Sequence, residues 1–251
     1  MTSSLRRLCL ALCVLVVLAS SPGLRAQAPK AQADASAAIP KTGNKHFFEA
    51  HDAYLARGKA GPMDLLFLGD SITENWSKAP EVWKAAYAKY SPANFGIGGD
   101  RTQHVVWRIE NGELDGIHPK VVVFMLGTNN SGDYTADQIF AADRKIVGMI
   151  QAKIPGVKVL LLAIFPRGPR KVGEVVDTGV ERMKVIAQVN AKLATLDDGK
   201  TVRYLDIGPK FLGPDGKIPD DIMPDQLHPN VAGYKIWVAA MQPLLTEMMG
   251  Y

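Results

Sequence analysis

Short apolar runs alternate along this chain with stretches in which apolar residues recur every three or four positions. The runs cover residues 65–68, 93–96, 121–126, 157–164 and 202–207. The third run contains no polar residue and is β-branched in its first half, whereas the second is the weakest. Apolar runs of this length are typical of strands that are covered on both faces of a parallel sheet. We therefore predict five strands.

Helical periodicity follows the third, fourth and fifth runs, and the last helix is expected to begin after His228-Pro229-Asn230. The apolar positions that define the three helices are Ile139, Ala142, Ile146 and Met149; Ile186, Val189, Leu193 and Leu196; and Tyr234, Val238, Met241, Leu245 and Met248. Strands that alternate with helices predict a three-layer α/β/α fold with a parallel sheet. In such a fold the ligand lies outside the carboxyl ends of the strands.

The N-terminal region has the pattern of a secretory signal peptide, which we assign to residues 1–28. Two arginines precede an apolar stretch at residues 8–18, and Ala26-Gln27-Ala28 offers a cleavage site between small residues. An uncleaved anchor is the alternative, but the stretch is shorter than the about 20 residues that a membrane span needs. We predict a secreted or periplasmic protein without stable membrane insertion after cleavage. Residues 29–45 read as a flexible linker and residues 46–251 as one domain.

Removal of the signal changes what the composition implies. Both cysteines, Cys9 and Cys13, lie inside it, so the mature chain has no disulfide and no thiol nucleophile. The formal net charge of the whole chain is +4, with 29 basic and 25 acidic residues. Three of the basic residues are arginines of the signal, and without them the charges nearly balance. We therefore predict no nucleic-acid partner. The histidines show no metal-ligand spacing, and no metal is predicted.

Four residues suited to acyl transfer follow the ends of predicted strands. Ser71 lies in the turn after the first run, Gly98 after the second and Asn129 after the third. His228 lies after the fifth run, before the last helix, and Asp225 precedes it by three residues. Because parallel strands share one carboxyl edge, all these residues are expected at the same edge of the sheet.

Serine-based ester hydrolysis needs a nucleophile, an oriented base and donors for the oxyanion. Ser71 suits the nucleophile, His228 the base, and Asp225 the carboxylate that holds the imidazole. The backbone N–H groups of Ser71 and Gly98 and the side-chain amide of Asn129 suit the oxyanion hole. Each residue alone is better explained as a helix cap, a glycine turn or an ordinary loop. Their common order and placement favour the catalytic interpretation.

The motif blocks around these residues resemble those of the SGNH, or GDSL-type, esterase superfamily. The similarity is greatest to the catalytic subunits of intracellular platelet-activating factor acetylhydrolase and their bacterial relatives, through residues 94–102, 111–117 and 165–168. The resemblance implies a flavodoxin-like sheet of order 2-1-3-4-5. It implies Ser71, Asp225 and His228 as the triad, and Ser71, Gly98 and Asn129 as the oxyanion hole. It implies no metal or organic cofactor.

We therefore expect a serine esterase that hydrolyses short-chain esters, with acetyl groups foremost. The substrate would be a small molecule or a carbohydrate ester, because the signal peptide separates this chain from its cytosolic relatives. A lysophospholipase or thioesterase of the same superfamily is an alternative, and a non-catalytic binding module that kept the fold is another. A homodimer is suggested by the resemblance alone.

Overall fold

The computed structural model describes residues 34–251, apart from the side chains of residues 172 and 175. The predicted signal peptide and the first part of the predicted linker lie outside the described residues. The described part forms one compact unit.

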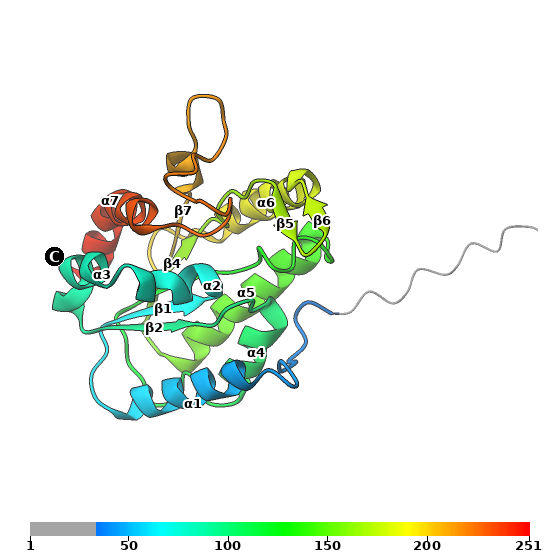
Figure 1. Cartoon of the computed structure of the whole chain (residues 1–251). Helices are drawn as coiled ribbons and strands as arrows, with labels where there is room; N and C mark the ends of the chain where they lie inside the picture. The colour runs from blue at the N-terminus through cyan, green and yellow to red at the C-terminus, as the bar shows by residue number, and fades with distance from the viewer. Residues whose placement is uncertain (1–33) are drawn as a thin grey trace, which may run out of the picture. The chain divides into compact units, whose positions relative to one another are not determined.

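A parallel sheet of five strands forms the centre of this unit (Figure 1). Its strand order is β2-β1-β3-β4-β7, which confirms the predicted order 2-1-3-4-5, since β7 is the fifth strand of this sheet. The strands are β1 (Leu65–Gly69), β2 (Pro92–Gly96), β3 (Val121–Met125), β4 (Lys158–Leu162) and β7 (Val202–Leu205). A separate antiparallel hairpin of β5 (Arg170–Val172) and β6 (Val175–Asp177) follows β4. No apolar run of the sequence predicted this hairpin.

Helices flank the sheet on both faces. They are α1 (Lys45–Lys59), α2 (Ser71–Glu74), α3 (Pro80–Tyr87), α4 (Thr102–Glu110), α5 (Ala136–Lys153), α6 (Val180–Leu193) and α7 (Val231–Met249), with short 3-10 helices η1 (Asn75–Lys78), η2 (Ala88–Tyr90), η3 (Ala194–Leu196) and η4 (Gly208–Phe211). The three helices predicted from periodicity correspond to α5, α6 and α7. Three of the strands, β3, β4 and β7, are shorter than their apolar runs by one or two residues at an end, because the adjoining apolar residues continue into buried turns. The strands β1 and β2 are each one residue longer than their runs.

Two hydrophobic cores lie on opposite faces of the sheet, and the residues of β1 alternate between them. Leu66 and Leu68 pack in the core that α4, α5 and α6 cover. Leu65 and Phe67 pack in the core beneath α3 and α7. A side chain in a strand points to the face opposite its neighbour's, so a continuous apolar run supplies both cores. The three-layer prediction is confirmed.

The short helix α2 packs closely against the carboxyl ends of β1 and β2. A methyl group on Gly96, the last residue of β2, would lie 2.2 Å from the backbone nitrogen of Glu74. A methyl group on Gly69, the last residue of β1, would lie 2.6 Å from the carbonyl oxygen of Met125. Both contacts are shorter than real Cβ contacts, so these strand ends need glycine. The absence of side chains there brings Ser71, at the start of α2, down onto the edge of the sheet.

The segment 34–44 packs on the domain, so the predicted flexible linker is wrong for these residues. Ala35 is buried, and its carbonyl oxygen accepts a 2.7 Å hydrogen bond from the Thr102 hydroxyl. The Lys145 ammonium donates to the carbonyl oxygen of Ser36 at 2.9 Å. Asn44 then caps α1 by accepting from the backbone of Phe47. The alanine-rich composition concealed this packing because its anchors are backbone carbonyls, which carry no sequence signal.

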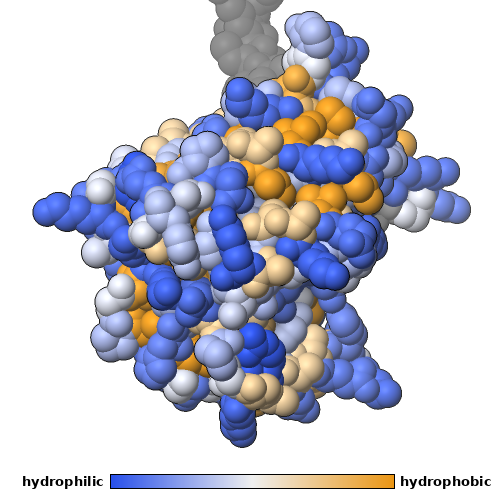
Figure 2. All heavy atoms as spheres, turned by 90° about the vertical axis from the view of Figure 1, so that its left-hand side faces the viewer, coloured by the Kyte–Doolittle hydropathy of each residue, from blue (hydrophilic) through white to orange (hydrophobic). Residues whose placement is uncertain are grey.

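The outer surface on the side of α3 and α7 is mostly hydrophilic, with hydrophobic residues gathered in the upper part of the view (Figure 2). Between residues 34 and 251, no helix combines the length and the apolar character that a membrane crossing requires.

Candidate active site

The structure brings Ser71, His228 and Asp225 into one chain of hydrogen bonds. Ser71 is the first residue of α2, and its hydroxyl oxygen lies 2.9 Å from Nε2 of His228. Nδ1 of the same ring lies 2.6 Å from Oδ2 of Asp225. The two residues of the acid–base pair lie on the loop between η4 and α7. A serine, an imidazole and a carboxylate in this order can pass a proton from the hydroxyl to the ring.

Local backbone geometry explains why Asp225 and His228 meet at a spacing of three residues. Oδ1 of Asp225 accepts from the backbone N–H groups of Leu227 at 3.2 Å and His228 at 2.8 Å. Gln226 takes the left-handed conformation, with φ of 59°, and its carbonyl oxygen accepts from the backbone N–H of Gly168 at 2.8 Å. One carboxylate oxygen of Asp225 therefore stabilises the turn, and the other contacts the imidazole.

Arg170 on β5 forms a further contact with this carboxylate. Its Nη2 lies 2.8 Å from Oδ2 of Asp225, the oxygen that also faces His228. Partial burial alone would raise the pKa of Asp225. Hydrogen bonds from the backbone and ring of His228, together with the charges of His228 and Arg170, outweigh it and lower the pKa below the ordinary value. The carboxylate therefore stays ionised, as a partner of the ring N–H must be.

Ser71 and Gly98 are neighbours in space, and each carries a backbone N–H group. A methyl group on Gly98 would be 4.0 Å from Cβ of Ser71, which places the two residues in contact. Within residues 34–251, the N–H groups of both residues have no hydrogen-bond acceptor. Two unused donors beside a nucleophile form a site for an oxyanion. The carboxylate of Glu74, paired with His46 at 2.5 Å, also lies beside Gly98, where a methyl group would be 2.8 Å from Oε2 of Glu74.

Asn129, which follows β3, brings its amide to the same place. Its Nδ2 donates to the carbonyl oxygen of Asp100 at 2.8 Å. The second hydrogen faces Oδ2 of Asp70, at 3.4 Å from the nitrogen. A contact of that length is weak, so this hydrogen remains available to a ligand. All five residues predicted for the site are thus brought to one edge of the sheet.

Asp70 lies between the nucleophile and the core. Its Oδ1 accepts from the backbone of Ile72 at 2.9 Å and caps α2. Burial is the main cause that raises the pKa of Asp70 to about 7, and the negative charge of Asp100 adds to it. Asp143 on α5 is also fully buried; burial, and then the charge of Asp70, raise its pKa well above the ordinary value.

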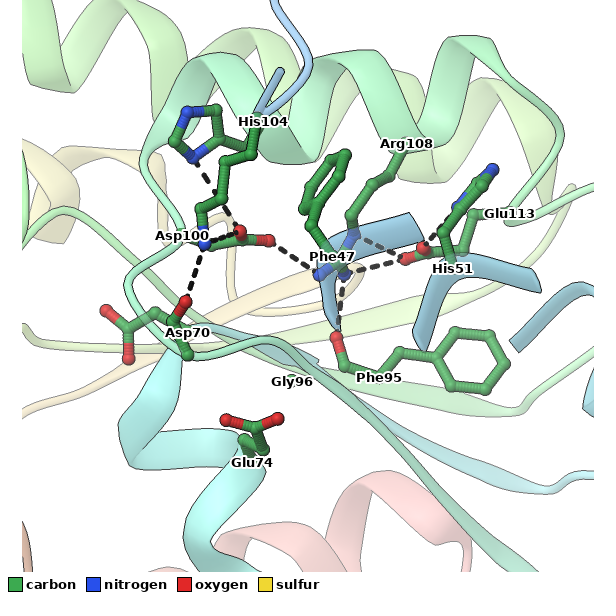
Figure 3. A network of polar contacts seen from close by, with 12 residues as sticks. Phe47, His51, Asp70, Glu74, Phe95, Gly96, Asp100, His104, Arg108 and Glu113 are labelled. Atoms are coloured by element: carbon green, nitrogen blue, oxygen red, sulfur yellow. Dashed lines mark hydrogen bonds and ion pairs between the residues drawn. The ribbon is translucent and has the colours of Figure 1, made fainter. Parts of the chain in front are cut away.

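A buried ionic network supports the loop that carries Gly98 (Figure 3). The guanidinium of Arg108, fully buried, lies 2.8 Å from Asp100 and 2.7 Å from Glu113. It also donates to the carbonyl oxygen of Phe95 at 2.7 Å. His51 contacts the other oxygen of Glu113 at 3.2 Å. The network joins the end of β2 to α4 and α1 and makes this corner of the site rigid.

A cavity of about 1140 Å³ lies beside Gln226. Residues 166–169, residues between 178 and 187, and the loop 212–220 also line it, but neither Ser71 nor His228 does.

No group of three or more histidine, cysteine, aspartate or glutamate side chains in the part of the chain that the structure describes could hold a metal ion.

Comparison with known proteins agrees with this geometry. The family model described as the GDSL-like lipase/acylhydrolase family matches residues 67–236. The alpha1 subunit of platelet-activating factor acetylhydrolase IB from Bos taurus is 34% identical over 209 residues, which cover 82% of this chain and 85% of that protein. The chain belongs to the GDSL-like lipase/acylhydrolase family. It is an ester hydrolase.

Solved structures share the fold of this esterase at low sequence identity. A GDSL-like lipase from Bacteroides thetaiotaomicron has a TM-score of 0.60 and 20% identity, with 78% of this chain and 97% of that chain covered. A carbohydrate acetylesterase family member from Sinorhizobium meliloti has a TM-score of 0.59 and 15% identity, with 75% and 100% covered.

Sequence reasoning missed several residues that touch the site of the esterase. Lys41, assigned to the flexible linker, contacts the Gly98 loop, and Arg170, on the hairpin that the sequence did not predict, contacts Asp225. Neither contact has a local signal, since 57 and 55 residues separate the partners. The acidic residue Asp100 in the Gly98 loop indicates that a cation could pair with it, but the sequence does not identify that cation.

Proposed function

We propose that this esterase hydrolyses short-chain esters, with acetyl esters foremost, through an acyl-enzyme on Ser71. The observation that carries the proposal is the continuous hydrogen-bonded chain from the Ser71 hydroxyl through His228 to Asp225. The unused N–H groups of Ser71 and Gly98 beside that hydroxyl support it. A binding module would have no need for a base aligned with a nucleophile next to two free donors.

The geometry supports a two-step reaction. Ser71 Oγ attacks the ester carbonyl carbon while its proton moves to Nε2 of His228, and Asp225 stabilises the imidazolium. The N–H groups of Ser71 and Gly98 and the amide of Asn129 hold the oxyanion. Collapse of this intermediate expels the alcohol, which takes the proton from Nε2. Water then loses a proton to the ring and attacks the acyl-enzyme carbonyl. Collapse of this second intermediate breaks the bond to Ser71 Oγ, which takes the proton back from Nε2, and the acid is released.

The names of relatives support the acyl group. The mammalian relatives are named acetylhydrolases, and one structural neighbour is described as a carbohydrate acetylesterase family member. We propose acetylated carbohydrates and other small acetyl esters as the substrate class, since the predicted signal peptide would take the chain out of the cytoplasm.

A comparison of three proteins tests the reaction. Wild type, Ser71→Ala and Ser77→Ala, an exposed serine of the neighbouring 3-10 helix, are assayed with p-nitrophenyl esters of increasing chain length. We expect Ser71→Ala alone to lose hydrolysis and fluorophosphonate labelling, with its melting temperature preserved. Undiminished turnover in Ser71→Ala would contradict the proposal. Preference for long chains would favour the lysophospholipase or thioesterase alternative, and a wild type that neither reacts with the probe nor hydrolyses any ester would favour the binding module.

We also propose that the chain is exported and that residues 1–28 are removed. Expression of the full chain in a Gram-negative host, followed by mass spectrometry of the periplasmic and cytoplasmic protein, tests this. A mature form that begins near residue 29 in the periplasm is expected. An intact N-terminus in the cytoplasm would contradict it.

A further inference from the structure

The ammonium group of Lys41 lies on the loop that carries the oxyanion-hole glycine. Its Nζ donates to the carbonyl oxygen of Gly98 at 2.5 Å and lies 2.8 Å from Oδ1 of Asp100. Only 12% of the Lys41 side chain is exposed, and the Asp100 side chain is fully buried. Because the cation is largely withdrawn from water, both contacts are stronger than those of a surface lysine.

Other groups hold the same loop through other atoms of Asp100. Oδ2 of Asp100 pairs with Arg108 at 2.8 Å, as Figure 3 shows. The carbonyl oxygen of Asp100 accepts from Asn129 at 2.8 Å. Lys41 supplies the contact to the carbonyl of Gly98 itself. Lys41 thus connects the Gly98 carbonyl to Asp100 and its partners.

The backbone around Lys41 is anchored on both sides, so the ammonium is delivered to a defined position. The backbone N–H of Ile39 donates to the carbonyl oxygen of Gln103 at 3.2 Å, and Ala35 is buried. After Lys41, the side chain of Asn44 caps α1. The ammonium also lies 5.6 Å from the ring centre of Phe47 in α1, a cation–π distance.

We propose that Lys41 is a positioning residue of the oxyanion hole, and that residues 34–44 form a strap that fixes the loop of Gly98. The proposal rests on the proposed function. A cation on the Gly98 carbonyl fixes the orientation of the peptide that follows the glycine, and so limits rotation of the N–H that precedes it. The ammonium contacts the glycine whose N–H is a proposed oxyanion donor, so its positive charge also favours the negative charge that develops there. A chain cut after Lys41 would keep the catalytic residues and lose this support.

Three variants of the full chain test the proposal. Lys41→Met keeps the length of the side chain and removes its charge, and Asp100 keeps Arg108 as a partner. Lys41→Arg restores a cation. Lys45→Met is the matched control, because Lys45 lies four residues away and its side chain is 88% exposed. The measurements are kcat and KM for p-nitrophenyl acetate, and the inhibition constant of a boronic acid, which forms a tetrahedral adduct on a reactive serine.

For Lys41→Met we expect kcat to fall about 10- to 100-fold with KM within about two-fold, since small displacements of transition-state donors carry losses of this size. The boronate inhibition constant should rise in parallel with the loss in kcat/KM. Lys41→Arg should recover most of kcat, and Lys45→Met should match wild type. A kcat of Lys41→Met within two-fold of wild type would overturn the proposal, and so would an equal loss in Lys45→Met.

Hydrogen exchange separates this inference from the proposed function. The backbone amides of residues 97–101 should exchange faster in Lys41→Met than in wild type, whereas those of β3 should not change. This readout does not depend on hydrolysis, so it stands even if wild type has no esterase activity and the proposed function fails. Unchanged exchange at residues 97–101 would overturn the strap. A loss of protection throughout the domain, with a large fall in melting temperature, would also overturn it, because Lys41 would then be a general stability residue.

Discussion

Nε2 of His228 lies 2.9 Å from the hydroxyl of Ser71, although 157 residues separate the two. The sheet accounts for this contact, because Ser71 directly follows β1 and the loop of His228 leads into α7, whose first turns lie against α2. The hydroxyl of Tyr234 on α7 donates to the carbonyl oxygen of Ile72 at 2.7 Å, next to the serine. This hydrogen bond holds α7 against α2 and so fixes the distance between base and nucleophile.

Replacement of Asp225 by Asn should lower kcat by about 10³- to 10⁴-fold with little change in folding. Oδ1 already accepts from two backbone N–H groups, so the amide oxygen is expected to take that position. The amide nitrogen would then face Nδ1 of His228 and donate to it, which selects the tautomer whose Nε2–H points at Ser71. Initial-rate kinetics on Asp225→Asn, with the exposed Asp215→Asn as control, measure the effect. A fall of less than ten-fold would show that the carboxylate does not orient the ring.

Replacement of Asn129 by Ala should lower kcat by about 10²- to 10³-fold, the loss typical of one oxyanion donor. KM should change much less, because the ground-state ester carbonyl carries little charge. Asn111→Ala is a suitable control, since Asn111 also donates its amide to a backbone carbonyl but at the exposed end of α4. If KM rose while kcat stayed constant, Asn129 would bind substrate without stabilising the oxyanion.

Replacement of Asp70 by Asn should change how stability depends on pH. Burial raises the folded-state pKa of Asp70 to about 7, so the folded state binds more protons than the unfolded state between about pH 4 and pH 7. Stability from this group therefore decreases as pH rises through that window, by at most about 4 kcal/mol. Asn keeps the cap on α2 and cannot ionise. The variant cannot show this loss. The stability of Asp70→Asn minus that of wild type should therefore be larger at pH 8 than at pH 4.

Urea unfolding of both proteins across that pH range checks this prediction. The exposed residue Asp52 provides the control, because Asp52→Asn should follow wild type at every pH. Parallel stability curves for wild type and Asp70→Asn would contradict the raised pKa.

Replacement of Arg108 by Met should destabilise the domain by about 3–5 kcal/mol. The side chain is fully buried, and its loss would leave Glu113 with only His51 and would leave the Phe95 carbonyl without its donor. Removal of one member of a buried ionic network carries a penalty of this size. Arg144→Met on the exposed face of α5 should stay within about 0.5 kcal/mol of wild type in the same urea titration. Equal stabilities of Arg108→Met and wild type would show that the network contributes nothing net.

The sequence by itself determined the sheet and the placement of the catalytic candidates. Apolar runs located all five strands of the main sheet, because a buried parallel strand excludes polar residues on both faces. The short motifs around Ser71, Gly98, Asn129 and His228 each follow a strand, and parallel strands share one carboxyl edge. The pairing of Asp225 with His228 was also predictable, since three residues in a turn bring them together.

Only the tertiary structure decided what surrounds these residues. Lys41 on the Gly98 carbonyl and Arg170 on Asp225 both come from segments in which the sequence predicts neither a helix nor a strand. Periodicity and turn signals depend on neighbours a few positions apart. A contact between a charged side chain and a group more than 50 residues away depends instead on which polar groups remain without a partner in the folded domain. Those groups acquire their positions only when the helices and the sheet have packed.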